Sequence, residues 1–194
     1  MLFCSPTRRR NSDPSPDERG FLFRTVYNRV TTVNQIYTAF VASKLMYGLQ
    51  TAWFNTSSRR RLDGFQARCL RRICGILPSF MSRVSNATVL QQAGAAKASS
   101  TLLARQLALF GRIALLEDSS PLRQALFQSG SLNLIQAQKP RRRGRPRQSW
   151  PGMVREHAVQ AANGEAGLTA VLASKCRTRT SQWRRVVSQY CANV

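Results

Sequence analysis

Acidic side chains are scarce in this chain, which holds 8 Asp plus Glu against 30 Lys plus Arg in 194 residues. With a formal net charge of +22, the compact state repels itself in free solution, whereas phosphate groups attract the chain and neutralise it. We therefore expect nucleic acid as the partner, and no membrane and no small-molecule substrate. The scarcity also bears on catalysis, because metal-dependent phosphoryl or nucleotidyl transfer needs carboxylates that converge on metal ions.

The few acids and the single histidine do not form a recognisable catalytic set. Asp63 is the only acid between residues 19 and 116. Glu117 and Asp118 are neighbours that point apart on a helix, so a solvated turn explains them better than a metal site. His157 has no evident nucleophile partner and is interpreted as a packing or surface residue. The sequence predicts no metal, no cofactor and no enzyme activity of the chain by itself.

Paired cysteines and long apolar runs are also missing. The five cysteines form no C-x-x-C pair, and with one histidine they support neither a disulfide framework nor a zinc finger, so we interpret them as buried or idle thiols in a reducing compartment. The longest apolar stretch, residues 39–54, is interrupted by Lys44 and Gln50 and is shorter than the ~20 residues of a membrane span. The N-terminus lacks a secretory apolar stretch. We expect a protein that is not secreted, in the nucleus or alternatively in the cytoplasm.

Apolar residues at helical spacing are the main structural signal, and no convincing strand pair is visible. The sequence therefore predicts an all-α fold, a helical bundle. The clearest helix is capped by Ser57 or Ser58 and stopped by Gly75 and Pro78. Other helices are expected over 24–54, as one long helix or two joined near Gly48, over 86–94, 99–116 and 121–127, and after residue 149. One shared core is predicted, with Leu62, Phe65, Ile73, Leu103, Leu107 and Phe110.

Composition divides the chain into four segments. Residues 1–23 are rich in Pro, Ser and Arg and predict a disordered lead-in. Residues 24–128 form the predicted helical domain. Residues 129–148 lose helical periodicity to Gly, Pro and Arg and predict a basic linker. Residues 149–194 are predicted to form C-terminal helices, the last of them outlined by Trp183, Val186, Val187 and Tyr190.

The best predicted helix is also strongly basic. At ~100° per residue Arg61, Arg68 and Arg72 fall together, away from the apolar stripe, so one face packs and another follows a phosphate backbone. An ordinary solvated face is the alternative, although such faces mix both signs of charge. We predict nucleic-acid binding by all six arginines of this helix: Arg59, Arg60, Arg61, Arg68, Arg71 and Arg72.

A second basic cluster lies in the predicted linker. Its core, Arg143-Gly144-Arg145-Pro146, resembles an AT-hook, in which glycine permits close approach and arginines enter the narrow A·T minor groove. A nuclear import signal and a nonspecific phosphate tether remain alternatives. The cations predicted to bind nucleic acid here are Lys139, Arg141, Arg142, Arg143, Arg145 and Arg147.

Five motifs follow one another between residues 24 and 187. They are Leu-Met-Tyr-Gly-Leu-Gln-Thr-Ala-Trp at 45–53, Arg-Leu-Asp-Gly-Phe-Gln-Ala-Arg-Cys-Leu-Arg-Arg-Ile at 61–73, Leu-Ala-Leu-Phe-Gly-Arg at 107–112, Arg-Arg-Gly-Arg-Pro-Arg-Gln-Ser-Trp at 142–150 and Gln-Trp-Arg at 182–184. In order and approximate spacing the set resembles the C-terminal part of a non-LTR (LINE-type) retrotransposon reverse transcriptase. Gln50 stands where the family usually has Glu, and Arg112 where it has His.

The resemblance implies that the helices correspond to the polymerase thumb and its downstream extension, which hold template and primer. The parent activity would be RNA-directed DNA synthesis. No tyrosine of the chain opens the family's Tyr-x-Asp-Asp motif, and the zinc knuckle of some relatives is also missing. We therefore expect a noncatalytic, nucleic-acid-binding fragment, with polymerase and endonuclease regions upstream. The alternative is a host chromatin or DNA-binding protein that uses the AT-hook-like core.

Overall fold

The structure is a computed structural model, and it describes residues 32–135, 149–173 and 178–192. Within these ranges the chain is helical and has no β-strand, apart from an isolated antiparallel bridge between Phe127 and Leu134. The predicted all-α class is confirmed. The elements are a π-helix η1 (Tyr37–Ala42), α2 (Ser43–Met46), a 3-10 helix η2 (Leu49–Thr51), α3 (Thr56–Ile73), α4 (Ser79–Ser82), α5 (Asn86–Ala93), α6 (Ala98–Ala114), α7 (Pro121–Gln124), α8 (Trp150–Ala161), α9 (Glu165–Ala173) and α10 (Arg179–Ala192).

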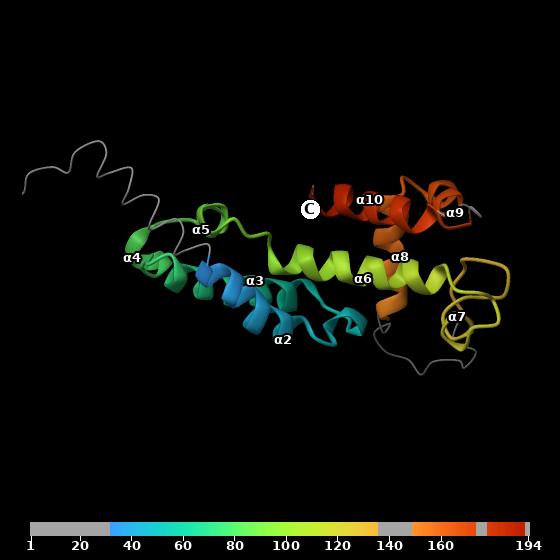
Figure 1. The fold of residues 1–194 in the computed structure, drawn as a ribbon, viewed down its shortest axis with the longest axis horizontal. Coiled ribbons are helices and arrows are strands. Elements are labelled where there is room, and N and C mark those ends of the chain that lie inside the picture. Colours follow the sequence, from blue (N-terminus) through green and yellow to red (C-terminus); the bar gives the residue numbers. More distant parts are fainter. Residues whose placement is uncertain (1–31, 136–148, 174–177, 193–194) are drawn as a thin grey trace, which may run out of the picture.

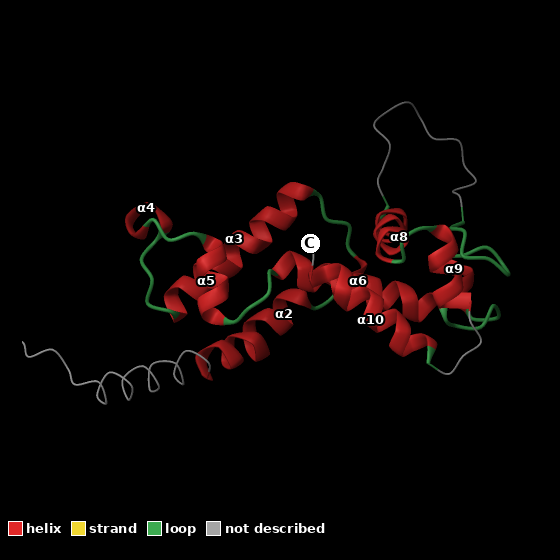
Figure 2. Ribbon diagram, turned by 90° about the horizontal axis from the view of Figure 1, so that it is seen from above, coloured by secondary structure: helices red, strands yellow, loops and turns green. Residues whose placement is uncertain are grey.

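Helix α6 is the spine of an elongated molecule (Figure 1). It contacts α3, η2, α7, α8 and α10, and the view from above shows α10 lying along it (Figure 2). Leu103, Leu107 and Phe110, which were predicted as core residues of this helix, are buried, and Ala114 on the same side is buried with them. Among the described residues, no helix combines the length and the apolar character that crossing a bilayer requires.

Helix α6 receives its N-terminal cap from another helix. Lys97, at the N-cap position, provides no side-chain cap. Instead, Asp63 of α3 accepts from the Ser99 amide and the Ser99 hydroxyl, both at 2.8 Å. The Gln66 side chain, also from α3, accepts from the Ala98 amide at 2.7 Å. Two polar residues of α3 thus satisfy amides that the first turn of a helix leaves free.

Helix boundaries partly match the predictions. Asn55 caps helix α3, because its side chain accepts from the Ser58 amide at 2.6 Å. The predicted caps, Ser57 and Ser58, lie inside the first turn of the helix. Its end agrees with the prediction, because Gly75 turns the chain with φ +67°. Gly48, with φ +74°, likewise ends the first helical segment, and only the short η2 follows it. The predicted helix 121–127 is limited to α7, and α9 was not predicted.

The buried apolar residues form three clusters, so the prediction of one shared core is wrong. Leu103, Leu107 and Phe110 of α6 belong to the largest cluster. Leu62 packs in a second one with Met46, Ala98 and Leu102, and Ile73 packs at the edge of a third one with Tyr37, Leu70, Val89 and Ala93. Phe65 is 37% exposed and belongs to none of the three.

A rotated contact face of α3 explains the error at Phe65. The buried residues of α3 are Leu62, Gln66, Ala67, Leu70 and Arg71. At ~100° per residue their centre is displaced from the apolar stripe toward the side of Ala67 and Arg71. Two polar residues are buried there because hydrogen bonds satisfy them, and Phe65 is left at the opposite edge.

The C-terminal helices share a core with α6. Phe110 and Phe127 meet edge to face, with ring centroids 5.3 Å apart. They pack in the same cluster as Val154 of α8, Leu168 of α9 and Trp183 of α10. The predicted segments 24–128 and 149–194 therefore contribute to one common cluster, although composition changes between them.

Candidate nucleic-acid interface

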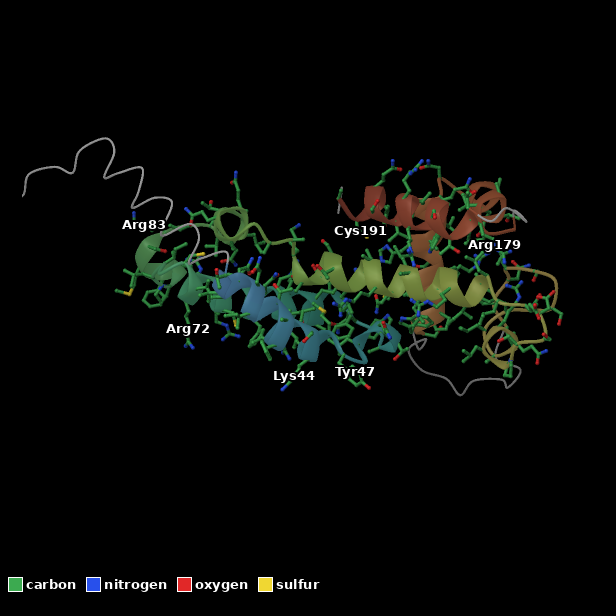
Figure 3. All side chains as sticks on the ribbon, in the orientation of Figure 1. Lys44, Tyr47, Arg72, Arg83, Arg179 and Cys191 are labelled. Atoms are coloured by element: carbon green, nitrogen blue, oxygen red, sulfur yellow. The ribbon has the colours of Figure 1, made fainter. Side chains whose placement is uncertain are left out.

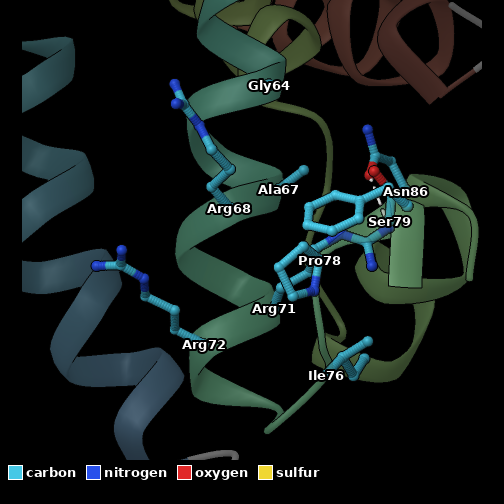
Figure 4. Close-up of a pocket in the computed structure, with 10 residues that line it drawn as sticks. Gly64, Ala67, Arg68, Arg71, Arg72, Ile76, Pro78, Ser79 and Asn86 are labelled. Carbon is cyan, nitrogen blue, oxygen red and sulfur yellow. Dashed lines mark hydrogen bonds between the residues drawn. The ribbon is translucent and has the colours of Figure 1, made fainter. Parts of the chain in front are cut away.

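Helix α3 separates its predicted nucleic-acid-binding arginines into exposed and engaged ones. Arg60, Arg61, Arg68 and Arg72 are exposed. Arg59 is half-buried, and its Nη2 donates to the sulfur of Met153 at 3.3 Å. Figure 4 shows Arg68 and Arg72 on one side of α3 and Arg71 turned toward Asn86 on the other.

Arg71 is a correction to the predicted set, because its side chain is only 5% exposed. Nη1 donates to the Leu77 carbonyl at 3.1 Å and to the Ser82 hydroxyl at 3.3 Å. Nη2 donates to the Val84 carbonyl and to Asn86 Oδ1, the latter at 3.0 Å. A buried charge needs such partners. Arg71 therefore fixes the loop between α3 and α5 and has no free face for a phosphate.

A surface hollow lies between α3 and this loop, and we call it the α3–α4 hollow. Its volume is about 480 Å³, which falls in the range typical of ligand sites. From α3 it is lined by Gly64, Ala67 and the three arginines at 68, 71 and 72, and from the opposite side by Pro78, Phe80 and Asn86. No acidic side chain lines it. The hollow thus combines apolar walls with a positive edge.

Sequence reasoning missed the apolar part of this surface. Phe80 is 81% exposed, Met81 60% and Leu77 57%, and all three lie close together in the chain around α4. The available signal was three large apolar residues around the helix breaker Pro78, outside any helical stripe. Contiguous exposed apolar groups of this kind mark binding surfaces more often than scattered ones do.

The same edge of the molecule carries further cationic and aromatic side chains. Figure 3 shows Lys44, Tyr47 and Arg72 pointing outward along it. Tyr47 follows α2 and is almost fully exposed, and Lys44 is exposed as well. Exposed cations with an exposed aromatic ring beside them are groups that a nucleic-acid strand can contact.

Three acidic side chains of the described residues are engaged away from the hollow. Asp63 caps α6 at Ser99, as described above. Asp118 pairs with Arg123, and Glu165 pairs with Arg155 at 2.8 Å. The exposed arginines of α3 make no ion pair with any described residue. Their charge is therefore left for a partner.

A chain of hydrogen bonds around His157 lies where α3, α8 and α10 meet. His157 Nδ1 is 2.9 Å from the Tyr190 hydroxyl, which donates to Gln160 at 2.8 Å, and Nε2 is 3.5 Å from the Arg59 guanidinium. Burial first, and then the Arg59 charge, lower the pKa of His157, while Glu156 acts in the opposite direction. Burial raises the pKa of Tyr190. With no nucleophile in this group, its observed role is to connect the three helices.

No group of three or more His, Cys, Asp or Glu residues in the described ranges is placed to hold a metal ion. Cys69, Cys74 and Cys191 are free thiols, all half-buried, and burial raises the pKa of Cys74 and of Cys191. The linker cations, from Lys139 to Arg147, and the AT-hook-like core lie outside the described residues.

Comparison of the chain with protein families, with curated proteins and with solved structures finds no match.

Proposed function

We propose that this chain binds nucleic acid through the exposed arginines of α3, as a noncatalytic fragment related to a non-LTR retrotransposon reverse transcriptase. The observation that carries the proposal is uncompensated charge on one helix. Arg60, Arg61, Arg68 and Arg72 are exposed and make no ion pair with a described residue. The only acid of α3, Asp63, is bonded to Ser99 through both carboxylate oxygens. Phosphate groups would supply the missing negative charge.

The linker cations would add to this attraction. Lys139, Arg141, Arg142, Arg143, Arg145 and Arg147 are close together in sequence, and neutralised phosphates release counterions at each contact. The parent activity, RNA-directed DNA synthesis, rests on the resemblance of the five sequence motifs. The chain alone would then hold nucleic acid without extending a primer. A primer-extension assay with magnesium tests this part, and incorporation that copurifies with the chain contradicts it.

Binding is tested by fluorescence anisotropy on a labelled duplex and on its labelled single strand, each over a series of salt concentrations. The double variant Arg68→Gln/Arg72→Gln should bind more weakly. It should also flatten the slope of log K against log salt, by up to ~0.9 per lost contact on duplex and ~0.7 on single strand. Both side chains are exposed, so their replacement leaves the packed core intact.

The matched control is Arg184→Gln/Arg185→Gln, which removes the same charge from an exposed face of α10. The proposal predicts a smaller loss of affinity for this pair than for the α3 pair. Equal losses would mean that net charge, and not the α3 surface, attracts the polyanion. Absence of any salt-dependent binding by the native chain would refute the proposed function as a whole.

A further inference from the structure

The α3–α4 hollow offers a free aromatic face beside the basic edge. Phe80 lines the hollow, and most of its ring is open to solvent. Met81 and Leu77, close to Phe80 in the chain, are also largely exposed. Contact between this apolar area and water is unfavourable, so covering it would favour the binding of a flat apolar ligand.

The walls of the hollow are held in place before any ligand arrives. The buried guanidinium of Arg71 binds the loop opposite α3 at four points, two of them the carbonyls of Leu77 and Val84. On the α3 side, Gly64 leaves one end open, because a Cβ at that position would have no neighbour within 4 Å. A preorganised site loses less conformational entropy on binding.

Two exposed cations, Arg68 and Arg72, belong to the α3 wall of the hollow. Arg68 and Arg72 are one turn apart on α3, about 6 Å along its axis, so they can contact neighbouring phosphates of one strand. The ligand that this surface fits is therefore flat and apolar at one point and anionic next to it. A nucleotide with an uncovered base has both properties.

We propose that the α3–α4 hollow is a binding site for single-stranded nucleic acid, in which one unstacked base lies on the ring of Phe80 and the adjacent phosphates lie on Arg68 and Arg72. This inference rests on the proposed function and deepens it. In a duplex the neighbouring base pairs cover both faces of each base, so no base face is free to stack on Phe80. In a single strand the face is free, and stacking on an aromatic side chain tolerates every base.

The test measures Phe80→Ala by anisotropy against oligo(dT), oligo(U) and a mixed-sequence duplex at one salt concentration. Affinity for the single strands should fall by roughly 5- to 150-fold, the equivalent of one lost stacking contact, and affinity for the duplex should change less than about twofold. Phe40→Ala is the matched control, because Phe40 is also largely exposed but lies on η1 and not in the hollow. It should leave both affinities unchanged.

A second measurement does not depend on a variant. An oligonucleotide with a single 5-iodouracil should crosslink on irradiation to Phe80 of the native chain, as located by peptide mass spectrometry. Equal affinity for single strand and duplex, both insensitive to Phe80→Ala, would overturn this inference and leave the proposed function standing. Crosslinks confined to other residues would also overturn it. Loss of all binding by the native chain would instead remove the proposed function itself.

Discussion

The indole of Trp183 lies directly against the backbone of Gly111, where α10 packs along α6. Its Nε1 donates to the carbonyl of Leu107 at 2.9 Å. A Cβ at position 111 would stand 2.0 Å from Nε1 and 2.2 Å from Cδ1 of that ring. Gly111 is therefore the residue that lets α10 approach α6 so closely. Two separate sequence motifs, at 107–112 and 182–184, meet at this contact.

Gly111→Ala should destabilise the fold, because the new methyl group collides with the indole. Overpacking costs about 1 to 3 kcal/mol, and a contact at 2.0 Å lies at the severe end of this range, above the ~1 kcal/mol that alanine gains over glycine in a helix. The free energy of unfolding in urea measures the difference. Gly64→Ala is the matched control, since Gly64 is also inside a helix but a Cβ there meets open space. It should stabilise the protein by up to ~1 kcal/mol, and equal effects at the two glycines would contradict this account of the α6–α10 contact.

Arg71 and Arg72 are neighbours in sequence with opposite roles in the structure. Arg71→Met should lower the free energy of unfolding by about 1 to 3 kcal/mol, because it leaves the part-buried carbonyls of Leu77 and Val84 without their charged donor. Arg72→Met should change it by less than about 0.5 kcal/mol, since Arg72 is exposed. Urea titration of both variants decides the matter, and similar losses would show that burial does not separate the two.

The apolar periodicity predicted what depends on apolar contacts alone. It placed Leu103, Leu107 and Phe110 of α6 correctly, because this stripe packs against apolar residues of the C-terminal helices. It failed at Phe65, since the orientation of α3 is decided by polar residues whose hydrogen-bond partners lie outside this helix. Arg71, for example, cannot be distinguished in the sequence from the exposed arginines, and only the structure shows the loop that it binds.

The candidate site was predictable in part for the same reason. Arg61, Arg68 and Arg72 are exposed on α3, as their spacing indicates. Phe80 could not be predicted as part of this site, because it lies in a four-residue helix that is too short to show an apolar periodicity. Only the fold brings it close to these arginines. The linker predictions lie outside the described residues and remain predictions.

Asp63 should contribute to stability through a helix that it does not belong to. Its carboxylate accepts two hydrogen bonds from Ser99 in the first turn of α6, where the helix dipole also favours negative charge. Asp63→Ala, which removes both acceptor oxygens, should therefore cost about 0.5 to 2 kcal/mol in the free energy of unfolding. Glu117→Gln, which removes an exposed acid, is the control and should stay within about 0.5 kcal/mol. Equal losses of stability in the two variants would mean that Asp63 acts through its charge alone and not through its hydrogen bonds to Ser99.

The stability of the fold should depend on pH through the hydrogen-bonded network of His157. The Tyr190 hydroxyl donates to Gln160, so its oxygen accepts from His157 Nδ1–H, and Nε2 is left as the acceptor that faces Arg59. This network needs a neutral ring, because a proton on Nε2 would point at a guanidinium. Burial and the Arg59 charge accordingly hold the pKa of His157 below its ordinary value of 6.5.

Because the folded state binds this proton less readily than the unfolded state, the contribution of His157 to stability is complete above about pH 6.5 and is lost as the pH falls toward the lower pKa of the folded state. The loss should not exceed about 1.4 kcal/mol per pH unit. Urea titrations between about pH 5 and 8 measure it, and His157 is the only histidine of the chain, so no other imidazole contributes. His157→Gln keeps one donor and one acceptor but does not titrate, so it should flatten the stability curve around pH 6. A slope that persists in that variant would show that groups other than His157 cause the pH dependence.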